Sequence, residues 1–380
     1  MTLPPWRRAV IKVGSALVAP ECRRVSNKYT LDIAAFITEC VNDGKEMILV
    51  TSGAIAAGLS TQPHLISHPL TIAEKQAMAA IGQPLLMSHW SKFFDFPCAQ
   101  LLLTYQGIHE RQRFVNAKNT LLKLLAQKTL PIVNENDTVV VDEIKVGDND
   151  NLAAQVAVLA DADILFICSD VDGLFDDNPR ENAGAQQIQI VTRIDQSIYR
   201  LAGKKGSSFA TGGMVTKIQA AEKATARGID TIVFNGKRRE SFQQLLRGAI
   251  PGTIFTKNAS PMNAKKHWML HTLKSCGRIG IDAGAHKALV QHGASLLPSG
   301  VLWVEGRFKQ GDAVRVLYED AEIAQGISQY DANDLAKIKG VKSSEIEGIL
   351  GYVCTDEVIH RDDLVLLAER AQENDARSSL

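Results

Sequence analysis

The 380-residue sequence lacks the features typical of secreted, membrane and nucleic-acid-binding proteins. Its six cysteines are scattered and form no CxxC or Cys/His pattern, which argues against a zinc site and against a disulfide framework. The 42 basic residues equal the 42 acidic ones, so no charge excess favours nucleic acid or an anionic membrane. No apolar run is long enough to span a bilayer, and no signal peptide is recognisable. We therefore expect a globular cytoplasmic protein with free thiols and no membrane association.

The motifs of several large enzyme classes are missing as well. There is no G-x-x-x-x-G-K-[ST] P-loop, no glycine-rich loop of the protein-kinase type and no G-x-S-x-G nucleophile elbow. An HRD triplet occurs at residues 360–362, but it lacks the downstream Asn and lies in the wrong kind of domain, so we interpret it as coincidence. These absences argue against P-loop enzymes, protein kinases and hydrolases that use a nucleophile elbow.

The first two thirds of the chain alternate short apolar runs with amphipathic segments, which is typical of α/β proteins. Strands that are apolar throughout predict a mostly parallel sheet with helices on both faces, which is a three-layer arrangement. The expected strands are residues 9–13, 46–51, 99–104, 130–134, 164–169 and 231–235. The expected helices are residues 31–43, 73–94, 111–127, 152–160 and 213–227.

The pattern changes after about residue 252, and a chain of 380 residues is long enough for two domains. Short strands punctuated by Gly and Asp follow residue 277 and predict a small β-barrel. The last residues are charged and polar, and we expect them to fray. The predicted division is a first domain of residues 1–257, a linker of residues 258–276, a β-barrel domain of residues 277–367 and a tail of residues 368–380.

Small and polar residues follow most of the expected strands, at the sheet edge where ligands of such folds bind. Asp170 ends one of these strands. Lys12 lies inside an apolar strand, just before Gly14. It can either reach solvent from an edge strand or place its ammonium group in a ligand pocket. Ser52 can be a simple helix N-cap or part of an anion site at a helix start.

Two further segments carry unusual polar residues. Lys217 follows a Gly-Gly pair in the first or second turn of an expected helix, where a cation opposes the helix dipole unless a phosphate is bound. A solvated Lys is the alternative. Residues 148–151 read DNDN before another helix, although a cap needs only one such residue. Lysines and glycine-bounded helix starts can hold phosphates, while Asp and Asn can hold an amine or the waters around Mg²⁺. The pattern predicts phosphoryl transfer without a P-loop.

Six ordered segments resemble those of glutamate 5-kinases, a group within the amino-acid kinase family: KVGS, VTSGAIAAG, NEND, EIKVGDNDNLAA, SDVDGLF and TGGMVTK. Residues 277 to about 352 are similar to the PUA domain that bacterial members append. The resemblance covers nearly the whole chain and implies the amino-acid kinase fold with a PUA-like barrel. It also implies Mg²⁺-assisted transfer of the γ-phosphoryl group of ATP to the γ-carboxylate of L-glutamate, the first step of proline biosynthesis.

The resemblance further implies roles for individual residues, without assigning any metal ligand directly. The implied catalytic residues are Lys12, Lys217 and Asp150. The two lysines would stabilise the transferring phosphoryl group, and the aspartate between them would organise them. The implied glutamate-binding residues are Ser52, Asp137 and Asn149, with Asn134 and Asp148 nearby. The residues implied on the ATP side are Lys12, Gly14, Ser169, Asp170, Thr211, Gly212, Gly213, Met214, Val215, Thr216 and Lys217. Ser169 and Ala210 stand where Thr and Gly are usual in this family, and we expect these two differences to affect the details of nucleotide binding.

Partners follow from the same resemblance. It implies inhibition by L-proline, a homo-oligomer that is either a dimer or a tetramer, and hand-over of the labile acyl phosphate to glutamate-5-semialdehyde dehydrogenase. Two alternatives stay open: a related kinase with another amino acid as acceptor, and an RNA-binding protein acting through the C-terminal barrel. Residues 277–353 carry eight Lys and Arg against ten Asp and Glu, which argues against RNA.

Overall fold

The computed structural model describes residues 1–20, 24–62, 64–65, 69–104, 107–108, 110–139, 149–179, 181–182, 184–202, 213–257 and 275–367. The chain divides into two compact units, one of Met1–Ile108 with Ala117–Pro261 and the other of His109–Asn116 with Met262–Leu380. The predicted linker and tail lie largely outside the described residues, so those finer boundaries stay predictions.

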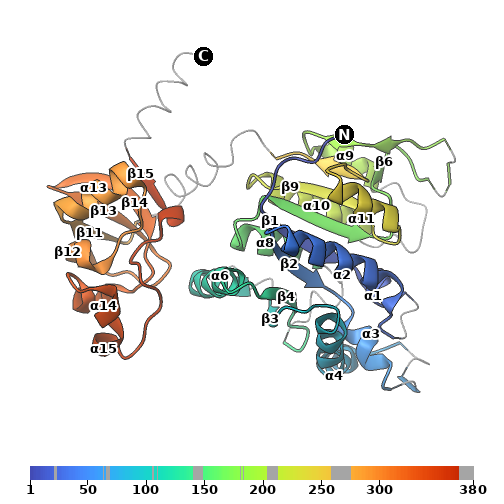
Figure 1. Ribbon diagram of the computed structural model, residues 1–380, viewed down its shortest axis with the longest axis horizontal. Helices are drawn as coiled ribbons and strands as arrows, with labels where there is room; N and C mark the ends of the chain where they lie inside the picture. Colours follow the sequence, from blue (N-terminus) through green and yellow to red (C-terminus); the bar gives the residue numbers. More distant parts are fainter. Residues whose placement is uncertain are drawn as a thin grey trace, which may run out of the picture. The chain divides into compact units, whose positions relative to one another are not determined.

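An eight-stranded sheet forms the centre of the first unit (Figure 1). Its strands, in spatial order, are β3 (Cys98–Leu103), β4 (Leu130–Glu135), β2 (Glu46–Thr51), β1 (Arg8–Val13), β5 (Ile164–Ser169), β9 (Asp230–Asn235), β10 (Thr253–Phe255) and β8 (Ile190–Val191). The first six strands run parallel, whereas β10 is antiparallel to β9. The prediction of a mostly parallel sheet is confirmed.

The strands form where the sequence is apolar on both faces. Strands β4, β5 and β9 are buried along their whole length, and such strands need a covering layer on each side. All six expected strands are found within one residue of their expected ends. Four shorter strands were not expected, because two or three residues carry no readable periodicity. They are β8, β10 and the small hairpin of β6 (Leu174–Phe175) and β7 (Gln187–Ile188).

Helices cover both faces of the sheet. The helices described up to residue 257 are α1 (Ser15–Val18), α2 (Asn27–Asn42), α3 (Ala54–Leu59), α4 (Ile72–Ser91), α6 (Arg111–Ala126), α8 (Asn149–Leu159), α9 (Gln196–Ala202), α10 (Gly213–Thr225) and α11 (Arg239–Leu246). Of these, α6 begins among residues counted with the second unit, and α9 buries none of its residues. Local signals set their starts: the hydroxyl of Ser26 caps α2, and Thr71 forms a capping box with Glu74 at α4. Among the helices in the described part of the chain, none has the length and apolarity needed to cross a bilayer.

The alternation of side chains along β1 determines to which face of the sheet Lys12 points. Ile11 and Val13 belong to the apolar cluster that also contains Phe36 of α2. Successive side chains of a strand point to opposite faces, so Lys12 points away from α2. The helices α8 and α10 pack against each other, and α8 contacts β1. Lys12 therefore faces the layer in which α8 and α10 begin.

Glycines let α3 and α4 pack backbone to backbone directly after β2. A Cβ atom on Gly58 of α3 would overlap the carbonyl oxygen of Met78. A Cβ atom on Gly82 of α4 would overlap the carbonyl oxygen of Ala54. The position of α4 relative to the carboxyl end of β2 is therefore set by main-chain contact, with no side chain between the two helices at these points.

The second unit, predicted as a small β-barrel, contains a separate five-stranded sheet with β12 and β15 at its two ends. Its order is β12 (Val301–Gly306), β11 (Gly277–Ile281), β13 (Ala313–Tyr318), β14 (Ala321–Ile327) and β15 (Leu364–Leu366). Three helices accompany it that the sequence pattern had not indicated: α13 (Ala283–His292), α14 (Ala332–Ile338) and α15 (Ile346–Leu350). Ile279, Val316 and Leu335 are among the side chains of its apolar core.

Candidate active site

Two buried lysines meet one buried aspartate at the carboxyl end of the central strands. Nζ of Lys12 lies 2.6 Å from Oδ1 of Asp150, and Nζ of Lys217 lies 3.1 Å from Oδ2. The three side chains are only 7%, 9% and 4% exposed for Lys12, Lys217 and Asp150, respectively. Thr216 donates its hydroxyl hydrogen to Oδ2 of Asp150 at 2.8 Å. The structure thus brings together the three side chains that the sequence marked as catalytic.

Each member of this cluster comes from a different element. Lys12 reaches the cluster from β1, Asp150 from the first turn of α8, and Lys217 from the start of α10. Gly14 follows β1, and a Cβ atom there would lie 3.6 Å from Nζ of Lys12. A side chain at Gly14 would therefore lie in contact with the Lys12 ammonium group. The alternative in which Lys12 reaches solvent from an edge strand is wrong, because β1 has a neighbour on each side.

Charge decides the protonation states in this cluster. Burial alone would raise the pKa of Asp150, but the adjacent charges of Lys12 and Lys217 outweigh it and hold that pKa well below its usual range. Burial lowers the pKa of Lys217, and the Asp150 carboxylate opposes that shift. With one carboxylate between two ammonium groups, the cluster has an excess of positive charge suited to an anionic ligand. The alternative of a solvated Lys217 is wrong.

A second cluster of polar side chains lies at the ends of β2 and β4. Nδ2 of Asn149 lies within hydrogen-bond distance of three acceptors, which share its two hydrogens: the carbonyl oxygen of Thr51 at 2.8 Å, Oγ of Ser52 at 2.9 Å and Oδ1 of Asn134 at 2.8 Å. These residues are far apart in sequence, and the parallel strands bring them to one edge of the sheet. Three of the residues expected to hold a substrate thus share one hydrogen-bonded network.

The structure shows how two helices begin, which the sequence had left open. The N-cap of α3 is Gly53, with φ of 112°, and no side chain caps this helix. Ser52 is therefore not a cap, and its hydroxyl accepts from Asn149 instead. Helix α8 begins at Asn149, so Asp150 and Asn151 lie within its first turn and neither serves as the cap. The carboxylate of Asp150 contacts Lys12, Thr216 and Lys217, which explains why more polar residues are present than a cap needs.

Asp137 follows β4 and is half-buried. Burial raises the pKa of its carboxyl group to about 6. No ion pair joins Asp137 to another side chain in the described part of the chain. A positively charged group placed beside it would reverse the pKa shift, so the carboxylate is suited to an ammonium group.

The residues implied on the nucleotide side follow β5 and open α10. The hydroxyl of Ser169 donates to Oδ1 of Asp170 at 3.4 Å, and Oδ2 of Asp170 lies 3.7 Å from Nζ of Lys237. Lys237 follows β9 and was not singled out from the sequence, because a Lys after a strand carries no special pattern. Gly213, Met214, Val215, Thr216 and Lys217 occupy the first turn and a half of α10. Asp148, Thr211 and Gly212 lie outside the described residues.

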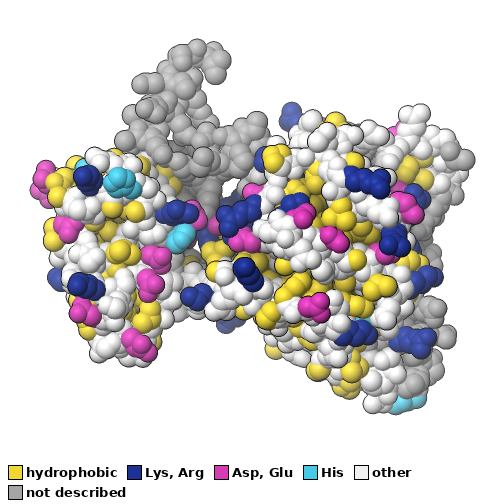
Figure 2. Space-filling model, viewed as in Figure 1, with side chains coloured by type: hydrophobic (Ala, Val, Ile, Leu, Met, Phe, Trp, Pro, Cys, Tyr) yellow, Lys and Arg dark blue, Asp and Glu magenta, His cyan; other side chains and the backbone are white. Residues whose placement is uncertain are grey.

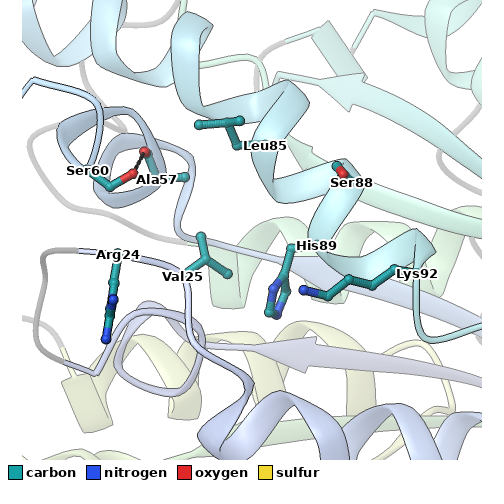
Figure 3. A pocket seen from close by; sticks show the side chains of 8 residues that line it. All are labelled: Arg24, Val25, Ala57, Ser60, Leu85, Ser88, His89 and Lys92. Atoms are coloured by element: carbon teal, nitrogen blue, oxygen red, sulfur yellow. Dashed lines mark hydrogen bonds between the residues drawn. The ribbon is translucent and has the colours of Figure 1, made fainter.

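Helix α4 contributes contacts that sequence reasoning missed. The indole Nε1 of Trp90 donates to Oγ1 of Thr51 at 3.0 Å, and Nδ2 of Asn134 donates to Oε1 of Gln83 at 2.9 Å. A Gln or Trp inside an apolar helix gives no local signal of such a partner. Side chains of α4 also line part of a cavity of about 270 Å³ (Figure 3). It is lined by Arg24, Val25, Ala57, Ser60, Leu85, Ser88, His89 and Lys92.

Comparison with known proteins identifies the family of the chain. The amino acid kinase family matches residues 7–235, and the PUA domain matches residues 277–350. A glutamate 5-kinase of Idiomarina loihiensis is 52% identical over 97% of this chain and 100% of its own length. A glutamate 5-kinase of Salinibacter ruber is 54% identical over 97% of this chain and 99% of its own length. A glutamate 5-kinase of Xylella fastidiosa is 45% identical over 96% of both chains. The chain belongs to the amino acid kinase family.

Proposed function

We propose that this chain transfers the γ-phosphoryl group of ATP to the γ-carboxylate of L-glutamate, the first step of proline biosynthesis. The observation that carries the proposal is the buried Lys12–Asp150–Lys217 cluster at the carboxyl edge of a parallel sheet. The proposal is supported by glutamate 5-kinases of other organisms, which match nearly the whole chain.

The cluster answers the main chemical difficulty of this reaction. A glutamate side chain, with a reference pKa of ~4.3, is already an anion at neutral pH and needs no general base. The barrier lies in bringing this anion to a phosphate and in stabilising the charge on the phosphoryl oxygens. Lys12 and Lys217 supply fixed positive charge in a site that is shielded from water. Asp150 holds the two ammonium groups in place.

The polar cluster beside β2 and β4 suits the amino acid. Ser52 would donate its hydroxyl hydrogen to a carboxylate of L-glutamate, and Asp137 would pair with its α-ammonium group. The amide hydrogens of Asn149 face protein oxygens, so its side chain would contact the substrate as an acceptor only. Asn134 orients Asn149 through their hydrogen bond. Asp148, which the resemblance places nearby, completes the proposed glutamate site.

The ATP phosphates would lie against Gly14 and the start of α10, with Ser169, Asp170 and Thr211 to Lys217 on the nucleotide side. Among the described residues, no group of three or more His, Cys, Asp and Glu side chains could hold a metal ion. Mg²⁺ does not require such a group, because it commonly keeps several waters and binds substrate phosphates instead of an all-protein cage. When bound with ATP, Mg²⁺ would offset charge on the phosphates.

The test is a hydroxylamine-trapping assay with ATP and Mg²⁺. L-Glutamate, N-acetyl-L-glutamate and L-aspartate serve as acceptors, each with and without L-proline. Hydroxamate from L-glutamate alone, suppressed by L-proline, is the expected result, and it also tests the proposed feedback inhibition. Hydroxamate from another acceptor would favour a related carboxylate kinase, the open alternative. No hydroxamate from any acceptor would overturn the proposed function.

The remaining partners are also proposals. We propose a cytoplasmic homo-oligomer, either a dimer or a tetramer, whose labile product passes to glutamate-5-semialdehyde dehydrogenase. For the PUA-like domain we favour a structural or regulatory role over RNA binding. Acidic and basic side chains are intermixed on the face of the second unit seen in Figure 2, with no continuous basic surface there. Salt-sensitive RNA binding at micromolar protein would contradict this preference.

A further inference from the structure

A glutamine of α4 is hydrogen-bonded to the amide cluster proposed to hold the substrate. Gln83 is buried, with 7% exposure. Its Oε1 accepts from Nδ2 of Asn134 at 2.9 Å, and its Nε2 donates to Oε1 of Gln100 at 3.2 Å. Gln83 directly follows Gly82, whose backbone packs against α3, so its place beside β4 is fixed by the fold.

A main-chain group sets the direction of these bonds. The backbone N–H of Glu135 can only donate, and it donates to Oδ1 of Asn134 at 2.9 Å. Nδ2 of Asn134 must then lie on the other side of the amide, where it faces Gln83. Gln83 therefore has to present its oxygen to Asn134 and its nitrogen to Gln100.

The same reasoning extends to Ser52. The carbonyl oxygen of Thr51 can only accept, so it is Nδ2 of Asn149 that faces it, at 2.8 Å. That nitrogen also donates to Oγ of Ser52 at 2.9 Å. Because this bond uses a lone pair of the Ser52 hydroxyl, the hydroxyl hydrogen stays available for an acceptor. A carboxylate is an acceptor only, and it matches this polarity.

We propose that Gln83 is a positioning residue for the substrate carboxylate. Gln83 holds the Asn134 amide, and through it Asn149, in the orientation that makes Ser52 a hydrogen-bond donor to the ligand. The inference rests on the proposed function, in which Ser52 and Asn149 bind L-glutamate. Removal of the Gln83 oxygen leaves a buried N–H of Asn134 without its partner, a cost that favours a shift of the Asn134 side chain away from its bond with Asn149.

The opposite face of α4 supplies a matched control. Successive residues of a helix are turned by about 100°, so Ser88 and Lys92 lie on the side away from Gln83. Figure 3 shows both residues around the cavity associated with α4, and Gln83 is not among its lining residues. Ser88→Ala therefore changes α4 without touching the amide network. Leu86→Ala removes a buried side chain of the same helix and serves as a control for lost stability alone.

The experiment measures KM for L-glutamate and for ATP, together with the urea midpoint, in the full-length protein. The variants are Gln83→Leu, Gln83→Met, Ser52→Ala, Ser88→Ala and Leu86→Ala. We expect both Gln83 variants and Ser52→Ala to raise KM for L-glutamate about tenfold, the effect of losing one buried hydrogen bond, with KM for ATP unchanged. Ser88→Ala should change neither constant. Leu86→Ala should lower the urea midpoint and leave both constants unchanged.

Two results would overturn the inference in distinguishable ways. If Ser52→Ala raises KM for L-glutamate and the Gln83 variants do not, Gln83 does not position the site. A parallel rise of both KM values in the Gln83 variants, as from general loosening, would also contradict it. If Ser52→Ala leaves KM for L-glutamate unchanged, the proposed glutamate site itself fails. Gln83→Met, which is unbranched and close to Gln in size, keeps the test informative if Gln83→Leu does not fold.

Discussion

Nζ of Lys217 lies 3.1 Å from Oδ2 of Asp150, within the first turns of α10. The dipole at a helix start opposes a cation, and burial lowers the pKa of Lys217 further. Asp150 is the partner that offsets both effects. A transferring phosphoryl group would add the negative charge that this position favours, so the same lysine is costly in the empty site and useful in the transition state.

Lys217→Ala should mainly lower kcat, by on the order of 10²–10³-fold, because one preorganised donor to the phosphoryl oxygens is lost. KM for L-glutamate should change little, since Lys217 contacts none of the residues proposed to hold the amino acid. Steady-state hydroxamate formation measures both constants. Lys287→Ala, at an exposed position of the second unit, is the control that should leave both unchanged. A kcat equal to that of the unaltered protein would remove Lys217 from the mechanism.

Asp150→Asn should destabilise the fold as well as abolish activity. It leaves Lys12 and Lys217 buried without their shared counter-charge, and breaking a buried pair in this way costs about 3–5 kcal/mol. Urea denaturation at constant pH measures the loss in the free energy of unfolding. Lys217→Met in the Asp150→Asn background removes one of the two uncompensated charges and should recover part of the loss. A double variant no more stable than Asp150→Asn alone would show that charge repulsion is not the cause.

Much of the first unit was readable from the sequence because its signals are local. Strands such as β5 are apolar along their whole length, and the polar residues that follow them mark the functional edge of the sheet. The hydrogen bond between Gln83 and Asn134 could not be predicted from the sequence, because the two residues are 51 positions apart and neither stands in a distinctive pattern. Two of the three helices of the second unit were missed for a related reason: α14 and α15 are only seven and five residues long. Helix α13 has ten residues, and its length does not explain why it was missed.

Local capping preference does not decide the role of Ser52 or Asp150, because contacts with distant residues override it. Ser52 and Asp150 are both residues that favour helix N-caps. In the structure Ser52 instead accepts from Asn149, and Asp150 contacts two lysines that arrive from distant segments. Capping rules consider only residues that are close in sequence, so they cannot detect these partners.

Gly82→Ala should destabilise the protein and raise KM for L-glutamate. A Cβ atom at this position overlaps the carbonyl oxygen of Ala54, so α3 and α4 must separate, and α4 carries Gln83. Thermal unfolding and glutamate kinetics on the same preparations measure the two effects. Gly348→Ala is the matched control, because a Cβ atom there meets open space inside the helix α15, where Ala is favoured by about 1 kcal/mol. Equal unfolding temperatures for the two variants would show that the α3–α4 contact adapts.

The pH dependence of kcat/KM for L-glutamate should report Asp137. Burial raises the pKa of its carboxyl group to about 6, so in the free enzyme the charge that would pair with the substrate ammonium is lost as the pH falls through that value. We expect kcat/KM to fall below about pH 6, where the γ-carboxyl of glutamate, with a reference pKa of ~4.3, is still ionised.

Asp137→Asn separates this effect from other titrations and has an opposite consequence for stability. The variant should bind L-glutamate weakly at every pH and should lack the decline below about pH 6. A carboxyl group whose pKa is raised on folding makes the folded state less stable as the pH rises through that pKa. Asp137→Asn should therefore be more stable than the unaltered protein at pH 8 and no more stable at pH 4, as measured by urea unfolding. A variant that keeps the pH 6 decline, or gains no stability at pH 8, would contradict the assignment of this titration to Asp137.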